Sequence, residues 1–396
     1  MFKNKFAWIA PILAFVVIFI FSLTLFPSVQ PKPINLPIAI VNEDQGMELP
    51  NQQTINMGNN MVEMIQTPSP STNLKESAVK WVIVKNMEEM QKGLDNQEYY
   101  AAFVIPKDFS MKQSSLRTAE PSSPEVQLYI NQGMNMAAST MAGQILNGVV
   151  DTMNNNVRTQ LFAELEAQQA TLTVEQAANL VTPISKTVTN VNEVGENTAN
   201  GNAPVSLFQP LWMASMAGAA VVSIAGSKLK NYSRKDLLIA KLGQILIGMV
   251  VALVVGFGLT WIVDGMVGIH IPNFVDTALF LSITAFSFFL LISAVLSWLG
   301  IKGIILFVFM LFFGGPLLAL APEMMSSFYR DWIYSWLPMR FMVEGLRELF
   351  FFGKVLTWNA SMSALVWIGS ASIILILLSA LKAKSESTDE ESPITH

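Results

Sequence analysis

The sequence has no cysteine and only two histidines, His270 and His396, among 396 residues. The lack of cysteine excludes structural disulfides, thiolate zinc sites and a cysteine nucleophile. Two distant histidines provide neither a His-based catalytic triad nor a two-His metal site. No G-x-x-x-x-G-K-[ST] run is present, so the phosphate-binding loop of a P-loop ATPase is missing too. We therefore expect no enzyme and no cofactor, and any ATP hydrolysis must come from a partner.

Charged residues are also scarce, at 13%, whereas 52% of the residues are hydrophobic. A soluble domain carries about 25% charged residues, so the apolar excess requires a lipid environment. The net charge is −5 without a basic block, which gives nucleic-acid binding no electrostatic support. Residues 207–381 are almost continuously apolar and 27–206 are polar, which predicts two modules.

Six apolar segments are long enough to cross a membrane as helices. The first, residues 8–26, follows Lys3 and Lys5, exceeds the length of a signal-peptide core and lacks a small-x-small cleavage site, so we expect a retained anchor. We expect a polytopic α-helical membrane protein with six transmembrane helices. The five later segments form a membrane domain over 207–381 and lie at 207–226, 242–263, 277–298, 303–321 and 362–381.

Basic residues set the orientation of these helices by the positive-inside rule. They place both termini in the cytoplasm and residues 27–206 on the outer side of the cell membrane, which we expect to be bacterial. The tail, 382–396, has an acidic stretch and is expected to be disordered. The basic residues on the cytoplasmic side are Lys3, Lys5, Lys228, Lys230, Arg234, Lys235, Lys241, Lys302, Lys382 and Lys384.

The external segment, 27–206, is predicted to form an α+β domain. Short β-branched or aromatic runs at 36–41, 81–84, 101–105 and 126–130 indicate strands, and 87–94 has helical spacing of apolar residues. Residues 134–194 contain few turn formers, so one or two long helices are expected there. Residues 192–204 have the composition of a linker, either a plain connector or a hinge.

An acidic turn follows the first predicted strand, at 42–46 (N-E-D-Q-G). Its three side-chain oxygen ligands suggest calcium, but their spacing does not match an EF-hand loop. A polar turn is the favoured interpretation, and no metal site is expected.

A charged stripe marks the helix predicted near 337–352. Arg340, Glu344, Arg347 and Glu348 fall at i, i+4, i+7 and i+8, and the remaining positions are apolar. At about 14 residues this helix is too short to span the membrane, so we expect an interfacial or re-entrant helix on the outer face. Its charges either satisfy one another structurally or shape an exit path.

The loop between the second and third spans is basic, and Ser233 is a candidate helix cap there. The loop either holds anionic lipid headgroups or acts as the lever on which a motor domain pushes. Small residues at 214–220 and at Gly243, Gly248, Gly256 and Gly258 predict close helix packing or a mobile interface. The candidate coupling residues are Lys228, Lys230, Arg234, Lys235 and Asp236.

These features resemble the permease subunits of ABC-2 type exporters and, within them, the YhgE/Pip-like (phage infection protein-like) family. The resemblance rests on 37–46, on 99–110 (Y-Y-A-A-F-V-I-P-K-D-F-S) and on 129–132 (Y-I-N-Q) in the external segment. In the membrane it rests on 204–212 and on 337–347 (L-P-M-R-F-M-V-E-G-L-R). The external domain is shorter than in larger members of the family.

The resemblance implies six spans per subunit, a homo- or heterodimer of permeases, and a separate cytoplasmic ABC ATPase. It also implies short cytoplasmic helices that transmit ATPase closure, here at about 227–240. The expected function is outward movement of an amphipathic lipid, peptide or drug-like molecule. The alternatives are a membrane-anchored scaffold or receptor without transport, and a secondary transporter, which the scarcity of ionisable residues in the spans disfavours.

Overall fold

The computed structural model describes residues 32–48, 54–67, 77–118, 120–169, 171, 173–227 and 233–382, together with Phe15. The chain forms two compact units. The sheet unit contains Pro31–Glu193 and Ala321–Met325, and the helical unit contains Val194–Leu320 and the residues from Ser326 onward. The predicted first span, except Phe15, and the predicted disordered tail from residue 383 lie outside the described residues.

The sheet unit is built on a five-stranded sheet of order β4-β1-β5-β6-β7. Strand β1 pairs in parallel with β4 and β5, β5 is antiparallel to β6, and β6 is parallel to β7. A two-stranded antiparallel ribbon, β2 and β3, accompanies this sheet. The strands are β1 (Leu36–Asn42), β2 (Met47–Glu48), β3 (Thr54–Ile55), β4 (Val79–Val84), β5 (Ala101–Ile105), β6 (Glu125–Asn131) and β7 (Ser185–Val191).

The four predicted strands are confirmed as β1, β4, β5 and β6, and the predicted helix at 87–94 is confirmed as α4. The prediction of helices up to residue 194 is wrong at its end, where β7 lies at the sheet edge. Five of the seven β7 residues are exposed, so the strand lacks the apolar alternation that identifies strands in a sequence. The helices are α3 (Met57–Gln66), α4 (Met87–Asp95), α5 (Phe109–Ser115), α6 (Met136–Ala167) and α7 (Val174–Val181).

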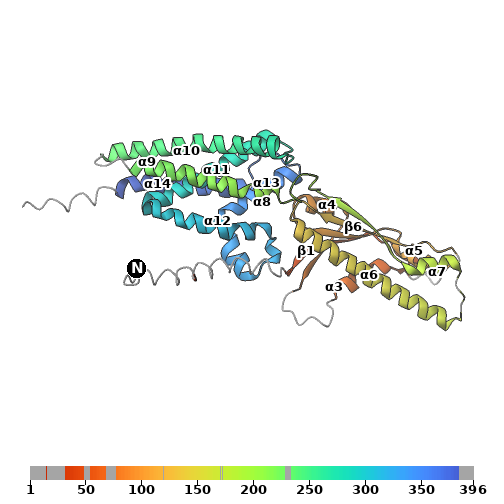
Figure 1. Ribbon diagram of the computed structural model, residues 1–396. Helices are drawn as coiled ribbons and strands as arrows, with labels where there is room; N and C mark the ends of the chain where they lie inside the picture. Colours follow the sequence, from red (N-terminus) through yellow and green to blue (C-terminus); the bar gives the residue numbers. More distant parts are fainter. Residues whose placement is uncertain are drawn as a thin grey trace, which may run out of the picture. The chain divides into compact units, whose positions relative to one another are not determined.

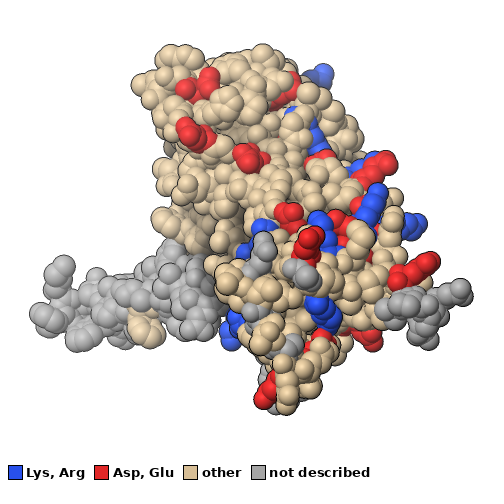
Figure 2. Space-filling view, turned by 90° about the vertical axis from the view of Figure 1, so that its right-hand side faces the viewer, with Lys and Arg blue, Asp and Glu red and all other residues tan. Residues whose placement is uncertain are grey.

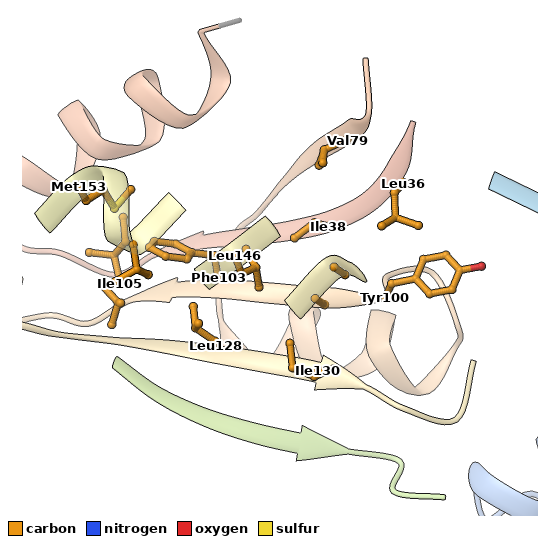
Figure 3. Packing of buried hydrophobic residues seen from close by; sticks show 14 of the residues in the cluster. Leu36, Ile38, Val79, Tyr100, Phe103, Ile105, Leu128, Ile130, Leu146 and Met153 are labelled. Carbon is orange, nitrogen blue, oxygen red and sulfur yellow. The ribbon is translucent and has the colours of Figure 1, made fainter. Parts of the chain in front are cut away.

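Helices cover both faces of the sheet. On one face, alternate residues of β1, β5 and β6, among them Ile38, Phe103 and Leu128, pack against α6 through Leu146 and Met153 (Figure 3). On the other face, the intervening residues of β1 and β5 pack against α4. The central strands are therefore buried on both sides, as in a largely parallel sheet.

A distant segment of the chain completes the first of these cores. Ala321 and Met324, in and beside the short helix η5 (Pro322–Met324), belong to the same apolar cluster as Leu36 and Tyr100. The carbonyl of Glu323 accepts a hydrogen bond from the amide of Ile34 at 2.8 Å, and its carboxylate accepts one from the Tyr100 hydroxyl at 2.7 Å. The sheet unit is thus assembled from two stretches of sequence.

The helical unit has long apolar helices that run side by side (Figure 1). Four stretches among the described residues are long and apolar enough to cross a membrane: Ala203–Gly226, Arg234–Val267, Phe274–Ala319 and Ala360–Leu381. The elements are α8 (Ala203–Ser206), α9 (Phe208–Ser227), α10 (Arg234–Ile262), η3 (Val263–Val267), α11 (Phe274–Leu299), η4 (Gly300–Gly303), α12 (Ile304–Ala319), η6 (Phe328–Ile333), η7 (Tyr334–Trp336), α13 (Pro338–Phe351) and α14 (Ala360–Lys382).

The stretch Phe274–Ala319 contains two helices that reverse direction at η4. Trp212 of α9 lies 4.8 Å from the Phe288 ring of α11 and 6.0 Å from the Phe307 ring of α12, between ring centroids. Its indole N–H also donates to the Phe307 carbonyl at 3.1 Å. On one straight helix, residues 288 and 307 would lie roughly 28 Å apart. Gly300, at φ +65°, supplies at this reversal a backbone conformation that residues with a side chain rarely adopt.

Helix α11 is the central helix of this unit, since most of its residues are buried whereas α10 exposes a long apolar face. Helices α10 and α11 approach closely at Gly256, where an added Cβ would lie 2.7 Å from the Ala278 carbonyl and would overlap Ser282. Gly248 likewise leaves no room beside Phe289. These two glycines serve close helix packing, one of the two roles predicted for the small residues.

Candidate functional site

Helix α13, which carries the charged stripe, is packed inside the helical unit. Its N-terminal turn starts at Pro338, whose fixed φ suits the first position of a helix. Ten of its 14 residues are buried, and it contacts α8, α11, α12 and α14. Gly345 lies against the Phe280 ring of α11 so closely that an added Cβ would overlap it. A helix near 337–352 is confirmed as α13, whereas its place at the outer face stays a prediction.

The charges of α13 face one another within a largely apolar setting. The Arg340 Nε atom lies 3.9 Å from a carboxylate oxygen of Glu344, one helical turn away. The Arg340 guanidinium also stacks over the rings of Phe341, at 4.6 Å, and Tyr334, at 5.5 Å, from the centroids. The Tyr334 hydroxyl bonds to Glu344. Aromatic faces and a carboxylate together stabilise this arginine.

Glu344 is held between opposing influences on its pKa. Burial raises the pKa of this carboxyl above its usual value, while the positive charges of Arg340 and Arg347 lower it. Arg347 itself is only 7% exposed. The fourth member of the stripe, Glu348, accepts a hydrogen bond from the Asn359 side chain at 2.9 Å, just before α14 begins. The stripe is thus a partly buried, mutually compensating group of charges, in which Arg347 is the buried member.

The candidate coupling residues lie at the start of α10. Ser233 caps this helix in a capping box: its hydroxyl accepts from the Asp236 amide at 3.3 Å, and the Asp236 carboxylate accepts from the Ser233 amide at 3.1 Å. Arg234, Lys235 and Asp236 are exposed there. Lys228 and Lys230 lie outside the described residues. The structure therefore positions three of the five predicted residues together.

The resemblance implied short cytoplasmic helices at about 227–240. Residues 234–240 are helical and form the first two turns of the 29-residue helix α10, while 228–232 lie outside the described residues. The Ser233 capping box begins the helix eight residues before the predicted span, and no turn former interrupts it before the apolar stretch. Arg234 and Lys235 are therefore part of the same helix as the apolar stretch that follows.

The acidic turn after β1 is a structural hub. Asp44 is 8% exposed, and its carboxylate accepts hydrogen bonds from the amides of Gly46, Gly58 and Ser110, at 3.3, 3.0 and 2.9 Å, and from the Ser110 hydroxyl. Gly58 and Ser110 are the second residues of α3 and α5, so one carboxylate stabilises two helix N-termini. These bonds agree with the favoured polar turn, and no metal-binding group was found among the described His, Asp and Glu residues.

Surface charge forms no patch of one sign on the face shown in Figure 2, where Lys and Arg side chains are interspersed with Asp and Glu. Sequence reasoning missed two participants near the stripe, Tyr334 and Asn359. Tyr334 precedes α13 and Asn359 precedes α14 in the sequence. Only the folded chain shows that Tyr334 bonds to the Glu344 carboxylate and Asn359 to the Glu348 carboxylate.

Comparison with known proteins identifies relatives of the chain. A family model described as ABC-2 family transporter protein matches residues 5–381. The uncharacterized protein YhgE of Bacillus subtilis (strain 168) is 22% identical over 125 residues, which cover 32% of this chain and 15% of YhgE. The matched region is thus a small part of that relative. No solved structure matches the chain.

Proposed function

Because the chain belongs to the ABC-2 family of transporter proteins, we propose that it is the permease subunit of an ATP-driven exporter. The match over nearly the whole chain is the observation that carries this proposal. The apolar helices of the helical unit support a membrane pathway, and the sequence lacks a P-loop of its own. The energy would come from a separate cytoplasmic ATPase, and the substrate would be an amphipathic lipid, peptide or drug-like molecule.

The proposed topology has six membrane helices, both termini in the cytoplasm and residues 27–206 outside the cell. Two observations support it. The reversal at η4 makes α11 and α12 two antiparallel segments. The start of α10 and η4, both of which carry basic residues, lie beside the same pocket and hence at one end of the helical unit, in agreement with the positive-inside rule. Two such permeases, identical or different, would form the complete transport pathway in a bacterial cell membrane.

Coupling to the ATPase is proposed at residues 228–236. The exposed Arg234 and Lys235 offer charges to a partner, and the capping box at Ser233 fixes the start of α10. Because α10 continues without a break into the membrane, a displacement at its first turn would be transmitted along a rigid helix. The stripe on α13 would then lie at the opposite, outer end of the helical unit and would stabilise or shape the exit.

The first experiment is purification of the complex from its native membrane in mild detergent, followed by mass spectrometry and ATP turnover. The proposal expects an ABC ATPase in stoichiometric amount. Repeated absence of an ATPase from otherwise intact preparations would instead favour the scaffold or receptor function.

A second experiment tests the coupling residues. Replacing Lys230, Arg234 and Lys235 together by Ala should abolish stimulation of the ATPase while membrane insertion stays normal. The matched control replaces three exposed lysines of the sheet unit, Lys80, Lys85 and Lys107, by Ala. Unchanged stimulation in the first variant would reject this coupling site.

A further inference from the structure

A pocket of about 630 Å³ opens at one end of the helical unit. It is formed where α9 ends, α10 begins, α11 passes into η4 and α14 ends. Its walls are largely apolar and include Val222, Leu237, Ile247, Leu296 and Ile301. The neighbouring lipid-facing surface of α10 is apolar as well. A ligand seated here would therefore meet hydrocarbon on most sides.

Lys241 is the one ionisable residue among the described residues that line this pocket. Its ammonium donates to the Ser297 hydroxyl at 2.9 Å and to the Gln244 side-chain oxygen at 3.4 Å. The Ser297 hydroxyl in turn donates to the carbonyl of Ser293 at 2.7 Å. Both partners of Lys241 are neutral, and no carboxylate in the described part of the chain forms an ion pair with it.

This arrangement contrasts with ordinary buried charges. An ammonium has three N–H donors, and two of them have neutral acceptors here. A partly buried cation in apolar surroundings carries a desolvation cost that an opposite charge offsets. The site therefore offers strong attraction to an anion, and its apolar walls offer attraction to hydrocarbon.

We propose that this pocket binds the phosphate headgroup of an anionic amphipathic lipid. Lys241, Ser297 and Gln244 would contact the phosphate, and the acyl chains would lie against the apolar walls and the exposed face of α10. The pocket is several times larger than a phosphate group, which is why a lipid fits it better than a free anion. In the topology proposed above the lipid comes from the cytoplasmic leaflet, but binding itself requires neither transport nor an ATPase.

The test uses the purified full-length protein in detergent with fluorescent short-chain phosphatidylglycerol, and diacylglycerol of the same chains, which lacks the phosphate, as the uncharged comparison. Lys241→Met should weaken phosphatidylglycerol binding about tenfold, because a partly buried charge-assisted contact exceeds the factor of about five expected for a surface lysine. Diacylglycerol binding should stay unchanged in Lys241→Met, and Lys241→Arg should retain most of the affinity for phosphatidylglycerol. The control is Lys85→Met, an exposed lysine of the sheet unit that lies outside the pocket and outside the proposed coupling residues.

A second variant tests the volume of the pocket without altering charge. An added Cβ at Gly243, which lines the pocket, meets no atom within 4 Å, so Gly243→Leu fills the space without straining the helix. It should weaken both lipids, whereas Gly243→Ala should weaken neither. Equal affinities of Lys241→Met and the unmodified protein for phosphatidylglycerol would overturn the proposal. Competition by millimolar inorganic phosphate would also overturn it, since the site would then be a small-anion site.

Discussion

The sheet unit and the helical unit each bury a charged group, and they compensate it in different ways. In the sheet unit, Asp44 is surrounded by backbone amides and one hydroxyl. In the helical unit, Arg340, Glu344 and Arg347 compensate one another on a single helix. Asp44 is stabilised mainly by backbone amides, which a side-chain substitution does not remove. The charges of α13 are stabilised by one another, so the substitution of one leaves the others without their compensating charge.

The largest expected effect is therefore in α13. Arg347→Met should destabilise the helical unit by about 2–4 kcal/mol, because it removes a positive charge that compensates Glu344; the loss stays below that of a fully buried pair since the Glu344 side chain is 36% exposed. Thermal unfolding in detergent, followed by tryptophan fluorescence, measures this loss. The double variant Arg347→Met/Glu344→Gln should recover part of it. Arg330→Met, which alters an arginine of η6 paired with the neighbouring Asp331, is the control and should change the unfolding temperature little.

A second prediction concerns the close contact that holds α13. Gly345→Leu should destabilise the helical unit by about 1–3 kcal/mol or more, because its side chain would overlap the Phe280 ring. Thermal unfolding is again the measurement, and Phe280→Leu in the same chain should restore part of the stability. Gly315→Ala on α12, where a Cβ meets no atom within 4 Å, is the control. Full stability of Gly345→Leu would show that α13 packs less tightly than described.

The hub in the sheet unit should be less sensitive to charge removal. Asp44→Asn keeps the size of the side chain but turns an NH₂ group toward amide donors, with an expected loss of about 1–3 kcal/mol. Hydrogen exchange should rise at the N-termini of α3 and α5, and Asp151→Asn, on the exposed face of α6, should leave it unchanged. Addition of calcium or of a chelator should alter neither variant. A calcium-dependent shift in unfolding would contradict the polar-turn interpretation.

The smallest effect is expected for a surface pair. Arg117 donates two hydrogen bonds to Glu164, which lowers the pKa of that carboxyl. The contribution of this pair is complete above the unfolded pKa of about 4.3 and is lost as the pH falls through the lower folded pKa. Its loss should cost well under about 1 kcal/mol, since both groups are partly solvated. Acid titration of unfolding should become slightly flatter in Glu164→Gln, and a change above pH 6 would point to another group.

The sequence predicted those elements whose signals are local. The runs around Ile38 and Phe103 are short, apolar and bounded by turn formers, so the strands were recognisable. The stripe from Arg340 to Glu348 had helical spacing and proved to be a helix. The start of α10 at Ser233 was visible as a cap, although its continuity with the membrane segment was not expected.

Other features depend on contacts between distant residues and had no local signal. Strand β7 is polar and exposed, and it is a strand because β6 provides a partner of matching register. Lys241 counted in the sequence only as one of many cytoplasmic charges, and its pocket exists only where four helices end together. The role of Glu323 in the sheet unit links residues more than 200 positions apart, which no periodicity can indicate.

That last contact has a consequence for biogenesis. The sheet unit lacks Ala321, Glu323 and Met324 until the ribosome has passed them, about 130 residues after β7, which corresponds to a delay on the order of ten seconds. During that interval α9 to α12 are being synthesised, and Tyr100 and the edge of the core beside Leu36 lack their contacts with Glu323 and Met324. The core of the sheet unit can therefore be completed only after α12 has been synthesised. A nascent chain stalled before residue 321 would expose the part of this core that Ala321 and Met324 cover, and would thus be open to proteases and chaperones.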